Sequence, residues 1–316
     1  MTASILVDDI VNMVRDGIDE RNLDTVTDSD ILQVLNRAQD YAADICARHW
    51  QEPLLTYTDV PLVNNQQEYP IPENAFEDRL EHVEVIIRGI HYELKYINYR
   101  QLAAYEIPTP QQVPSYYTIK GRTFRLIPAA IGSYIMRIWW LQNPETLQMS
   151  QGRITVMNPS SNYVILDSVG SDLTTSAAEN NCYVNFVDGT TGIIRGSAQI
   201  ASIVGNKVTF KTIPDRTSVY GKTISGTLPT DLSPDDQIAT VTGTCVPILK
   251  KPFSNFMIQF AVNEIRRRLG DDIAPEMQML KDFEDQVKHT WAGREQSIRI
   301  TKRSRNWLFP RRRLYT

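Results

Sequence analysis

The sequence predicts an α+β fold: a helical bundle of N- and C-terminal helices with a small antiparallel sheet, plus an inserted all-β domain and an extended C-terminal tail. Apolar residues recur with the helical period near both ends of the chain and with the period of two typical of strands between them. These changes of pattern along the 316 residues set the expected domains. Residues 1–144 and 247–298 form a helical and sheet core, residues 145–246 an inserted β domain, and residues 299–316 a basic docking tail.

Two helices are expected in the first 50 residues. The second helix has an apolar stripe at steps of three and four residues, with Thr27 or Ser29 as its N-cap. The first helix should begin near Ser4 and end near Gly17. The stripe of the second helix consists of Ile31, Leu35, Ala38, Ala42 and Ile45.

The next 90 residues alternate with period two and predict an antiparallel meander with a short helix near 99–106. Arg88-Gly89 and Lys120-Gly121 are expected to turn two hairpins. The predicted strands cover 55–59, 83–87, 92–96, 117–119, 124–126 and 134–140.

The inserted domain should be a small sandwich or barrel of short strands at roughly ten-residue spacing. Asp188-Gly189 and Gly205-Asn206 are hairpin-type turns. The candidate strands cover 154–157, 163–167, 182–187, 200–204, 208–211 and 220–224.

Two further helices follow. Pro252 suits the first position of a helix that ends at Gly270, and Pro275 opens another. The N- and C-terminal helices are expected to pack together with the first sheet. The apolar face of the last helix consists of Leu280, Phe283, Val287 and Trp291.

Composition excludes several classes of protein. With 42% hydrophobic and 22% charged residues, the chain is neither disordered, collagen-like nor a coiled coil. The three cysteines, Cys46, Cys182 and Cys245, lack the spacing of a disulfide framework or a zinc site. No signal-peptide layout or membrane span is present, so synthesis in a reducing cytoplasm is expected.

Motifs of catalysis are also missing. The sequence contains no Walker A, GxGxxG, GxSxG or HExxH motif, so we expect no enzyme activity, no cofactor and no metal. His82 and His91 face each other across a predicted hairpin, but ordinary surface histidines are the favoured interpretation. The 188–192 segment, DGTTG, is interpreted as a hairpin turn rather than a cation or phosphate loop. Asp235-Asp236 is interpreted as a turn rather than a catalytic carboxylate pair.

The tail breaks the globular pattern. It has seven basic and no acidic residues, so the overall charge of −4 divides into +7 and a body of −11. The residues expected to bind a partner are Arg299, Lys302, Arg303, Arg305, Trp307, Phe309, Pro310, Arg311, Arg312, Arg313 and Tyr315.

Three interpretations of the tail compete. It folds back on its own domain as a solvated segment, it binds nucleic acid through its arginines with Trp307 stacking on a base, or it docks as an extended peptide into a protein groove. Docking is favoured, because Trp307 and Phe309 provide aromatic anchors between two basic clusters and because the body is acidic.

The order of these elements is similar to that of a known family. The resemblance rests on ILQVLNRAQDY at 31–41, YPIP at 69–72, PSYY at 114–117 and FRLIP at 124–128. It covers residues 2–144 and 247–316 and leaves the central β region unmatched. The family that these segments resemble is that of the head-to-tail adaptor (connector) proteins of tailed bacteriophages.

The resemblance implies a non-enzymatic virion structural protein at the neck. It implies a ring, typically a dodecamer, that binds beneath the portal protein, connects capsid to tail and forms part of the DNA ejection channel. The implied partners are the portal protein, tail tube or nozzle proteins, other copies of the chain, and DNA that passes without sequence-specific binding; no membrane is involved. The inserted domain would lie outside the ring, near tail fibres or spikes. A nucleic-acid-binding module is the alternative, and a carbohydrate-active enzyme the least supported one.

Overall fold

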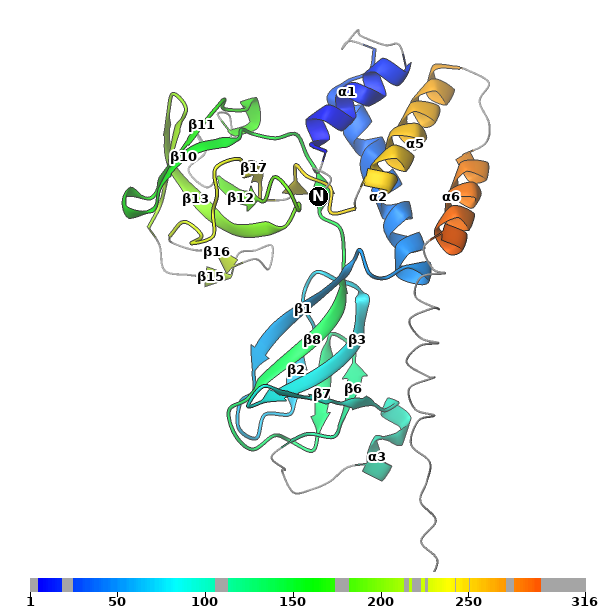
Figure 1. Ribbon diagram of the computed structural model, residues 1–316, viewed down its shortest axis with the longest axis vertical. Coiled ribbons are helices and arrows are strands. Elements are labelled where there is room, and N and C mark those ends of the chain that lie inside the picture. Colours follow the sequence, from blue (N-terminus) through cyan, green and yellow to red (C-terminus); the bar gives the residue numbers. More distant parts are fainter. Residues whose placement is uncertain are drawn as a thin grey trace, which may run out of the picture. The chain divides into compact units, whose positions relative to one another are not determined.

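The computed structural model describes residues 5–18, 25–105, 113–173, 182–212, 216–217, 223–224, 227–241, 243–249, 251–270 and 276–290. Contacts divide the chain into two compact units, which are described separately. The first consists of Met1–Pro53 and Pro144–Thr316, and the second of Leu54–Asn143. Both helices and several sheets are present (Figure 1), so the mixed α+β class is confirmed.

Helices from both ends of the chain contact one another in the first unit. The second of them begins at a capping box, in which the Thr27 hydroxyl accepts from the Asp30 N–H at 3.2 Å and the Asp30 carboxylate accepts from the Thr27 N–H at 3.0 Å. This confirms Thr27 as the N-cap. Gly270, with φ of +99°, follows the third helix. The four helices are α1 (Val7–Ile18), α2 (Asp28–His49), α5 (Lys251–Leu269) and α6 (Glu276–Thr290).

Aromatic side chains fill the space between these helices. The rings of Phe256 on α5 and Phe283 on α6 stack with centroids 4.0 Å apart, and Trp50 stacks on Phe253 at 5.8 Å. Phe253, Phe283 and Val287 are buried. The apolar face predicted for the last helix is therefore confirmed at Phe283 and Val287, whereas Trp291 lies outside the described residues.

Six strands of the first unit follow one another in the order β10-β11-β14-β13-β12-β17. The first and last strands of this order meet, because Arg153 and Gln237 form a β-bridge and the Ile154 N–H donates to the Asp236 carbonyl at 2.8 Å. The strands therefore curl around the buried side chains of Phe186 and Phe210. Their bounds are β10 (Ile154–Asn158), β11 (Tyr163–Leu166), β12 (Tyr183–Val187), β13 (Ile194–Val204), β14 (Lys207–Phe210) and β17 (Gln237–Thr240).

Shorter elements complete the first unit. The sequence did not predict β17, and of the predicted strand at 220–224 only residues 223–224 are described.

Asn36 of α2 connects the helices to the β region, because its side-chain oxygen accepts a hydrogen bond from the Leu147 N–H at 2.7 Å. The remaining elements are η2 (Pro159–Ser161), β9 (Thr146–Leu147), β15 (Arg216–Thr217), β16 (Thr223–Ile224) and β18 (Gly243–Thr244).

The second unit contains two four-stranded sheets, β1-β8-β3-β4 and β2-β7-β6-β5, around one apolar core. The two predicted hairpins, β3–β4 and β6–β7, are confirmed, as is the short helix. Its elements are β1 (Leu55–Pro61), β2 (Glu68–Pro70), β3 (Ala75–Ile87), β4 (Ile90–Glu93), β5 (Lys95–Tyr96), η1 (Tyr99–Gln101), α3 (Leu102–Tyr105), β6 (Tyr116–Lys120), β7 (Thr123–Ile127) and β8 (Ile135–Gln142).

The predicted single meander is wrong in two respects. β8 lies between β1 and β3, so the strand last in sequence occupies the middle of its sheet, and β5 pairs with β6 in parallel. β8 takes the central position because its apolar residues Met136 and Ile138 become completely buried there. Residues 54–143 form a compact unit of their own, so the expected packing of the helices on this sheet stays a prediction. Within the described residues, no helix is long and apolar enough to span a membrane.

Candidate interaction surfaces

Aromatic side chains form a row across one face of the β1-β8-β3-β4 sheet. Tyr57 on β1, Trp139 on β8 and His82 on β3 lie opposite one another in the strand register. The Trp139 ring centroid is 5.1 Å from that of Tyr57 and 5.4 Å from that of His82. Tyr57 remains 49% exposed. The row therefore presents aromatic area to solvent, a feature enriched at protein interfaces.

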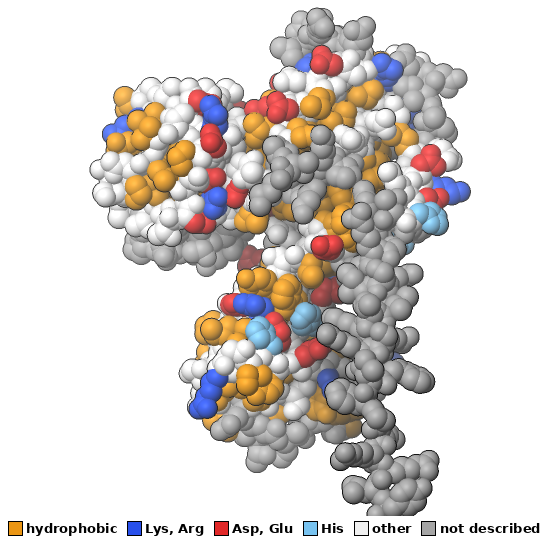
Figure 2. Space-filling view, viewed as in Figure 1, with side chains coloured by type: hydrophobic (Ala, Val, Ile, Leu, Met, Phe, Trp, Pro, Cys, Tyr) orange, Lys and Arg blue, Asp and Glu red, His pale blue; other side chains and the backbone are white. Residues whose placement is uncertain are grey.

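Charged side chains form a second row on the same face. Arg137 on β8 binds Asp59 on β1 through two hydrogen bonds of 2.7 and 2.8 Å. Glu84 on β3 lies opposite Arg137 and contacts His91 Nδ1 on β4 at 3.1 Å. The four groups, which we call the charged row, alternate in sign from β1 to β4 when His91 is protonated. Apolar, acidic, basic and histidine side chains are mixed over this part of the molecule (Figure 2).

Hydrogen bonds keep the carboxylates of the charged row ionised. The bonds from Arg137 lower the pKa of Asp59. Partial burial raises the pKa of Glu84, but hydrogen bonds from Trp139 and His91 outweigh it, so this pKa is also lowered. The Glu84 carboxylate accepts the Trp139 indole N–H at 3.0 Å and thereby links the two rows. These contacts hold the side chains of the two rows in fixed positions on the sheet.

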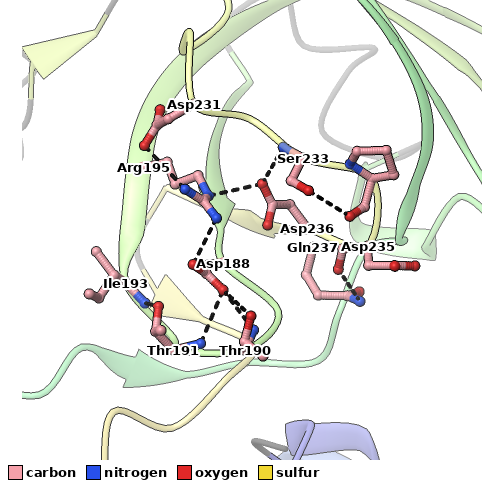
Figure 3. Close-up of polar contacts among 11 residues, drawn as sticks. Asp188, Thr190, Thr191, Ile193, Arg195, Asp231, Ser233, Asp235, Asp236 and Gln237 are labelled. Atoms are coloured by element: carbon pink, nitrogen blue, oxygen red, sulfur yellow. Dashed lines mark hydrogen bonds and ion pairs between the residues drawn. The ribbon is translucent and has the colours of Figure 1, made fainter. Parts of the chain in front are cut away.

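Arg195 on β13 is the centre of a second cluster, in which its guanidinium contacts three carboxylates (Figure 3). The nitrogen-to-oxygen distances are 2.7 Å to Asp188, 3.2 Å to Asp231 and 3.0 Å to Asp236. Asp236 is almost fully buried, whereas Asp231 is 62% exposed. The cluster joins the β12–β13 turn to the segment before β17, which assigns it a structural role.

The Asp188 carboxylate also closes its own turn. It accepts hydrogen bonds from the N–H groups of Thr190 and Thr191 at 2.7 and 3.1 Å. Partial burial raises the pKa of Asp188, but these bonds and those of the threonine hydroxyls lower it to about 2. The 188–192 segment joins the antiparallel strands β12 and β13, so the predicted hairpin is confirmed.

Asp235 and Asp236 have different partners. Asp236 contacts Arg195, while Asp235 lies 3.4 Å from Arg153. The Asp236 N–H donates to the Ser233 carbonyl at 3.2 Å, so the predicted turn is confirmed. Burial raises the pKa of Asp236, since it outweighs the hydrogen bond from Ser233.

Glu264 organises charge among the helices. This buried carboxylate on α5 contacts Arg37 on α2 at 3.0 Å, and Arg267 and Arg268 on its own helix at 2.6 and 3.2 Å. Burial raises the pKa of Glu264, but the hydrogen bonds from Arg37 and Arg268 outweigh it and lower the pKa. The Arg37 contact holds α2 against α5.

The structure describes the two predicted histidines but not the residues of the predicted docking tail. His82 and His91 lie on one face of the sheet, where they contact Trp139 and Glu84 respectively, in agreement with a surface role. Among the described residues, no group of three or more His, Cys, Asp or Glu side chains is arranged to hold a metal ion. All the tail residues, from Arg299 to Tyr315, lie outside the described residues, so their role stays a prediction.

Sequence reasoning did not single out Trp139, Arg137 or Arg195. For the first two, the available signal was the 135–142 segment, IMRIWWLQ, in which one arginine and two tryptophans lie in an otherwise largely apolar strand pattern. Arg195 gave no local signal, because its partners lie 7, 36 and 41 positions away in the chain. Only the folded arrangement brings them together.

The exposed aromatic side chains of the β1-β8-β3-β4 sheet are of the type enriched where proteins contact other macromolecules. The family comparison names the class of protein. The chain belongs to the SU10 adaptor protein family, whose model matches residues 1–169. The resemblance to phage head-to-tail adaptors is thereby confirmed, and the family is one of virion structural proteins that contact other head and tail components. A comparison with curated proteins gives no match.

The extent of the family match differs from the expected one. It continues past residue 144 through β10 and β11, which the sequence resemblance had left unmatched, and it ends before residues 247–316. The assignment therefore rests on the N-terminal helices, the second unit and the first strands of the β region.

Proposed function

We propose that this chain is a head-to-tail adaptor that assembles as a dodecameric ring beneath the portal protein, connects the capsid to the tail and encloses part of the DNA channel. The observation that carries this proposal is the family match over residues 1–169. The exposed aromatic and charged rows of the second unit support it, because an adaptor needs preorganised contact surfaces. Its role is structural rather than enzymatic.

The C-terminal tail is the proposed portal-docking element. Residues 299–316 carry seven basic residues around the segment Trp307-Leu308-Phe309-Pro310. Aromatic anchors flanked by arginines suit a groove with an acidic rim. Because every copy in a ring carries one tail, modest single contacts combine into tight attachment.

The remaining charge suits a DNA channel. Without the tail the chain has a formal charge of −11, and an acidic wall does not retain a polyanion as a basic wall would. The 145–246 region is proposed to lie outside the ring, where it would meet tail proteins such as the tube, nozzle, fibres or spikes. Synthesis takes place in the host cytoplasm before assembly.

Removal of residues 299–316 tests the docking role. The truncated chain should keep the circular dichroism and melting behaviour of the body and fail to join the portal in a co-sedimentation assay. Trp307→Ala with Phe309→Ala should reproduce most of the loss, because these changes remove the anchors but keep all seven charges. A truncated chain that joins the portal normally would contradict the proposed role of the tail.

Nucleic-acid binding through the same tail is the competing function, since the seven basic residues favour it. Its affinity for DNA would fall with salt along a logarithmic slope of about −6 if all seven groups touched phosphates of duplex DNA. We expect weak DNA binding that is unaffected by Trp307→Ala. A steep salt slope together with normal portal attachment of the truncated chain would favour the nucleic-acid module.

A further inference from the structure

The β1-β8-β3-β4 sheet ends in two strands, β1 and β4, that differ in sequence and run in opposite directions. All three neighbouring pairs within the sheet are antiparallel, so β1 and β4 are antiparallel to each other. If the sheet of one copy continued into the sheet of the next, the new pair would also be antiparallel. Because the two edges are different surfaces, such pairing repeats head to tail, and it gives a ring when the rotation from copy to copy closes on itself.

Among the described residues, none bonds to the backbone groups along the outer edge of β1. The Gln142 N–H donates to the Leu54 carbonyl, and the Leu62 N–H donates to the Tyr134 carbonyl. Together with the register of the β1–β8 pair, these bonds show that the backbone groups of the even-numbered residues of β1 bond to β8. The backbone N–H groups of Tyr57 and Asp59 therefore point away from β8, toward the outer edge of the sheet. Within the described residues, no other strand pairs with this edge.

The outer edge of β4 offers matching groups. The Leu94 N–H donates to the Val83 carbonyl at 2.8 Å, so the backbone N–H groups of Ile90, Tyr92 and Leu94 face β3. Those of His91 and Glu93 point away from β3, toward the outer edge. The side chains of His91 and Glu93 lie on the face that carries Glu84, as those of Tyr57 and Asp59 lie on the face that carries Arg137. A β4–β1 pair would therefore continue the sheet without interrupting its pleat.

The charged side chains of the two edge strands favour one register for pairing β4 of one copy with β1 of the next. When His91 is protonated, the charged row is negative, positive, negative and positive from β1 to β4, at Asp59, Arg137, Glu84 and His91. Asp59 of a following copy, set opposite His91, continues the alternation. This register sets Glu93 opposite Tyr57. Pairing of β1 with itself would instead bring two Asp59 carboxylates close together, and like charges across strands are unfavourable.

From this geometry we propose that β4 of one copy pairs with β1 of the next, with His91 opposite Asp59, so that the sheets of the second units run continuously around the ring. This inference rests on the proposed ring assembly and names the surface that makes it. The occupant of the β1 edge is therefore a second copy of this chain.

Cysteine cross-linking tests the register. Tyr57→Cys and Glu93→Cys are combined in a Cys182→Ser background, since Cys46 and Cys245 are buried. A short thiol–thiol cross-linker applied to the assembled head-to-tail junction should give a ladder of covalent multimers up to the closed ring. Ile135→Cys with Glu93→Cys is the control, because Ile135 is 49% exposed but lies on the central strand β8. It should give no ladder.

Backbone substitution gives an independent measurement. Tyr57→Pro and Tyr57→Ala both remove the tyrosine side chain, but only the proline removes the outward N–H, and an edge strand tolerates this. The loss of ring formation in Tyr57→Ala measures the side chain alone, and we expect Tyr57→Pro, with unchanged circular dichroism, to form rings about tenfold less well than Tyr57→Ala or worse.

The outcomes separate this inference from the proposed function. Normal rings on the portal without the cross-linked ladder would overturn the β4–β1 pairing and leave the adaptor role intact. Covalent dimers from Tyr57→Cys alone would show that β1 pairs with itself and would also overturn it. Failure of the unmodified chain to form any ring with its portal would overturn both proposals.

Discussion

Gly17 of α1 lies directly against Val262 of α5. A Cβ atom placed on Gly17 would lie 2.6 Å from Val262 Cγ2, closer than side-chain carbons approach one another. The Gly17 carbonyl accepts a hydrogen bond from Arg266 Nη2 at 2.6 Å on the same side. The absence of a side chain at position 17 thus sets how closely the N-terminal and C-terminal helices approach.

Gly17→Ala should destabilise the contact between α1 and α5 by about 1–2 kcal/mol, because overpacking outweighs the better helix propensity of alanine. Hydrogen exchange of the two helices measures the effect, since it reports local opening. In a Val262→Ala background the methyl group has room, and Gly17→Ala should become neutral or stabilising. Equal destabilisation in both backgrounds would show that the close approach does not limit the packing.

Arg195→Met should destabilise the β region by about 3 kcal/mol, because it leaves the buried Asp236 and the largely buried Asp188 without their counter-charge. Hydrogen exchange of β12 and β13 provides the measurement. Arg153→Met is the matched control, since Arg153 contacts Asp167 and Asp235 at 3.4 Å while 50% exposed. Its effect should stay below about 1 kcal/mol. Similar losses in the two variants would contradict the structural role assigned to Arg195.

Asp188→Asn should make the free energy of unfolding depend less on pH in the acid range. The pKa of Asp188 is lowered from 3.8 to about 2, so the carboxylate stabilises the fold above pH 4 and this contribution is lost as the pH falls toward 2. The variant should therefore be about 1–2 kcal/mol less stable at pH 7 and converge with the unmodified chain near pH 2.

Melting followed by circular dichroism from pH 7 to pH 2 measures this difference. Asp236 acts in the opposite direction, because its raised pKa favours the folded state as the pH falls, but it is present in both proteins and its contribution largely cancels. A constant gap between the two proteins across this pH range would show that the carboxylate charge of Asp188 is not what stabilises its turn.

Local signals were sufficient for most individual elements. The capping box at Thr27, the end of α5 at Gly270 and the hairpin turns at Arg88-Gly89 and Gly205-Asn206 agree with the structure. Each depends on residues within a few positions of one another, so a short stretch of chain contains all the relevant chemistry. The resemblance to phage adaptors also came from ordered local segments, and the family match over 1–169 confirms it.

The sequence by itself determined where the helices and most of the longer strands lie, the uneven charge of body and tail, and the family. Tertiary structure decided the position of β8 between β1 and β3, which split the expected meander into two sheets, and the meeting of Arg195 with Asp231 and Asp236. Strand order and buried ion pairs depend on which distant segments bury each other's apolar faces. Strand order and buried ion pairs therefore depend on packing across the whole chain and cannot be predicted from a local sequence pattern.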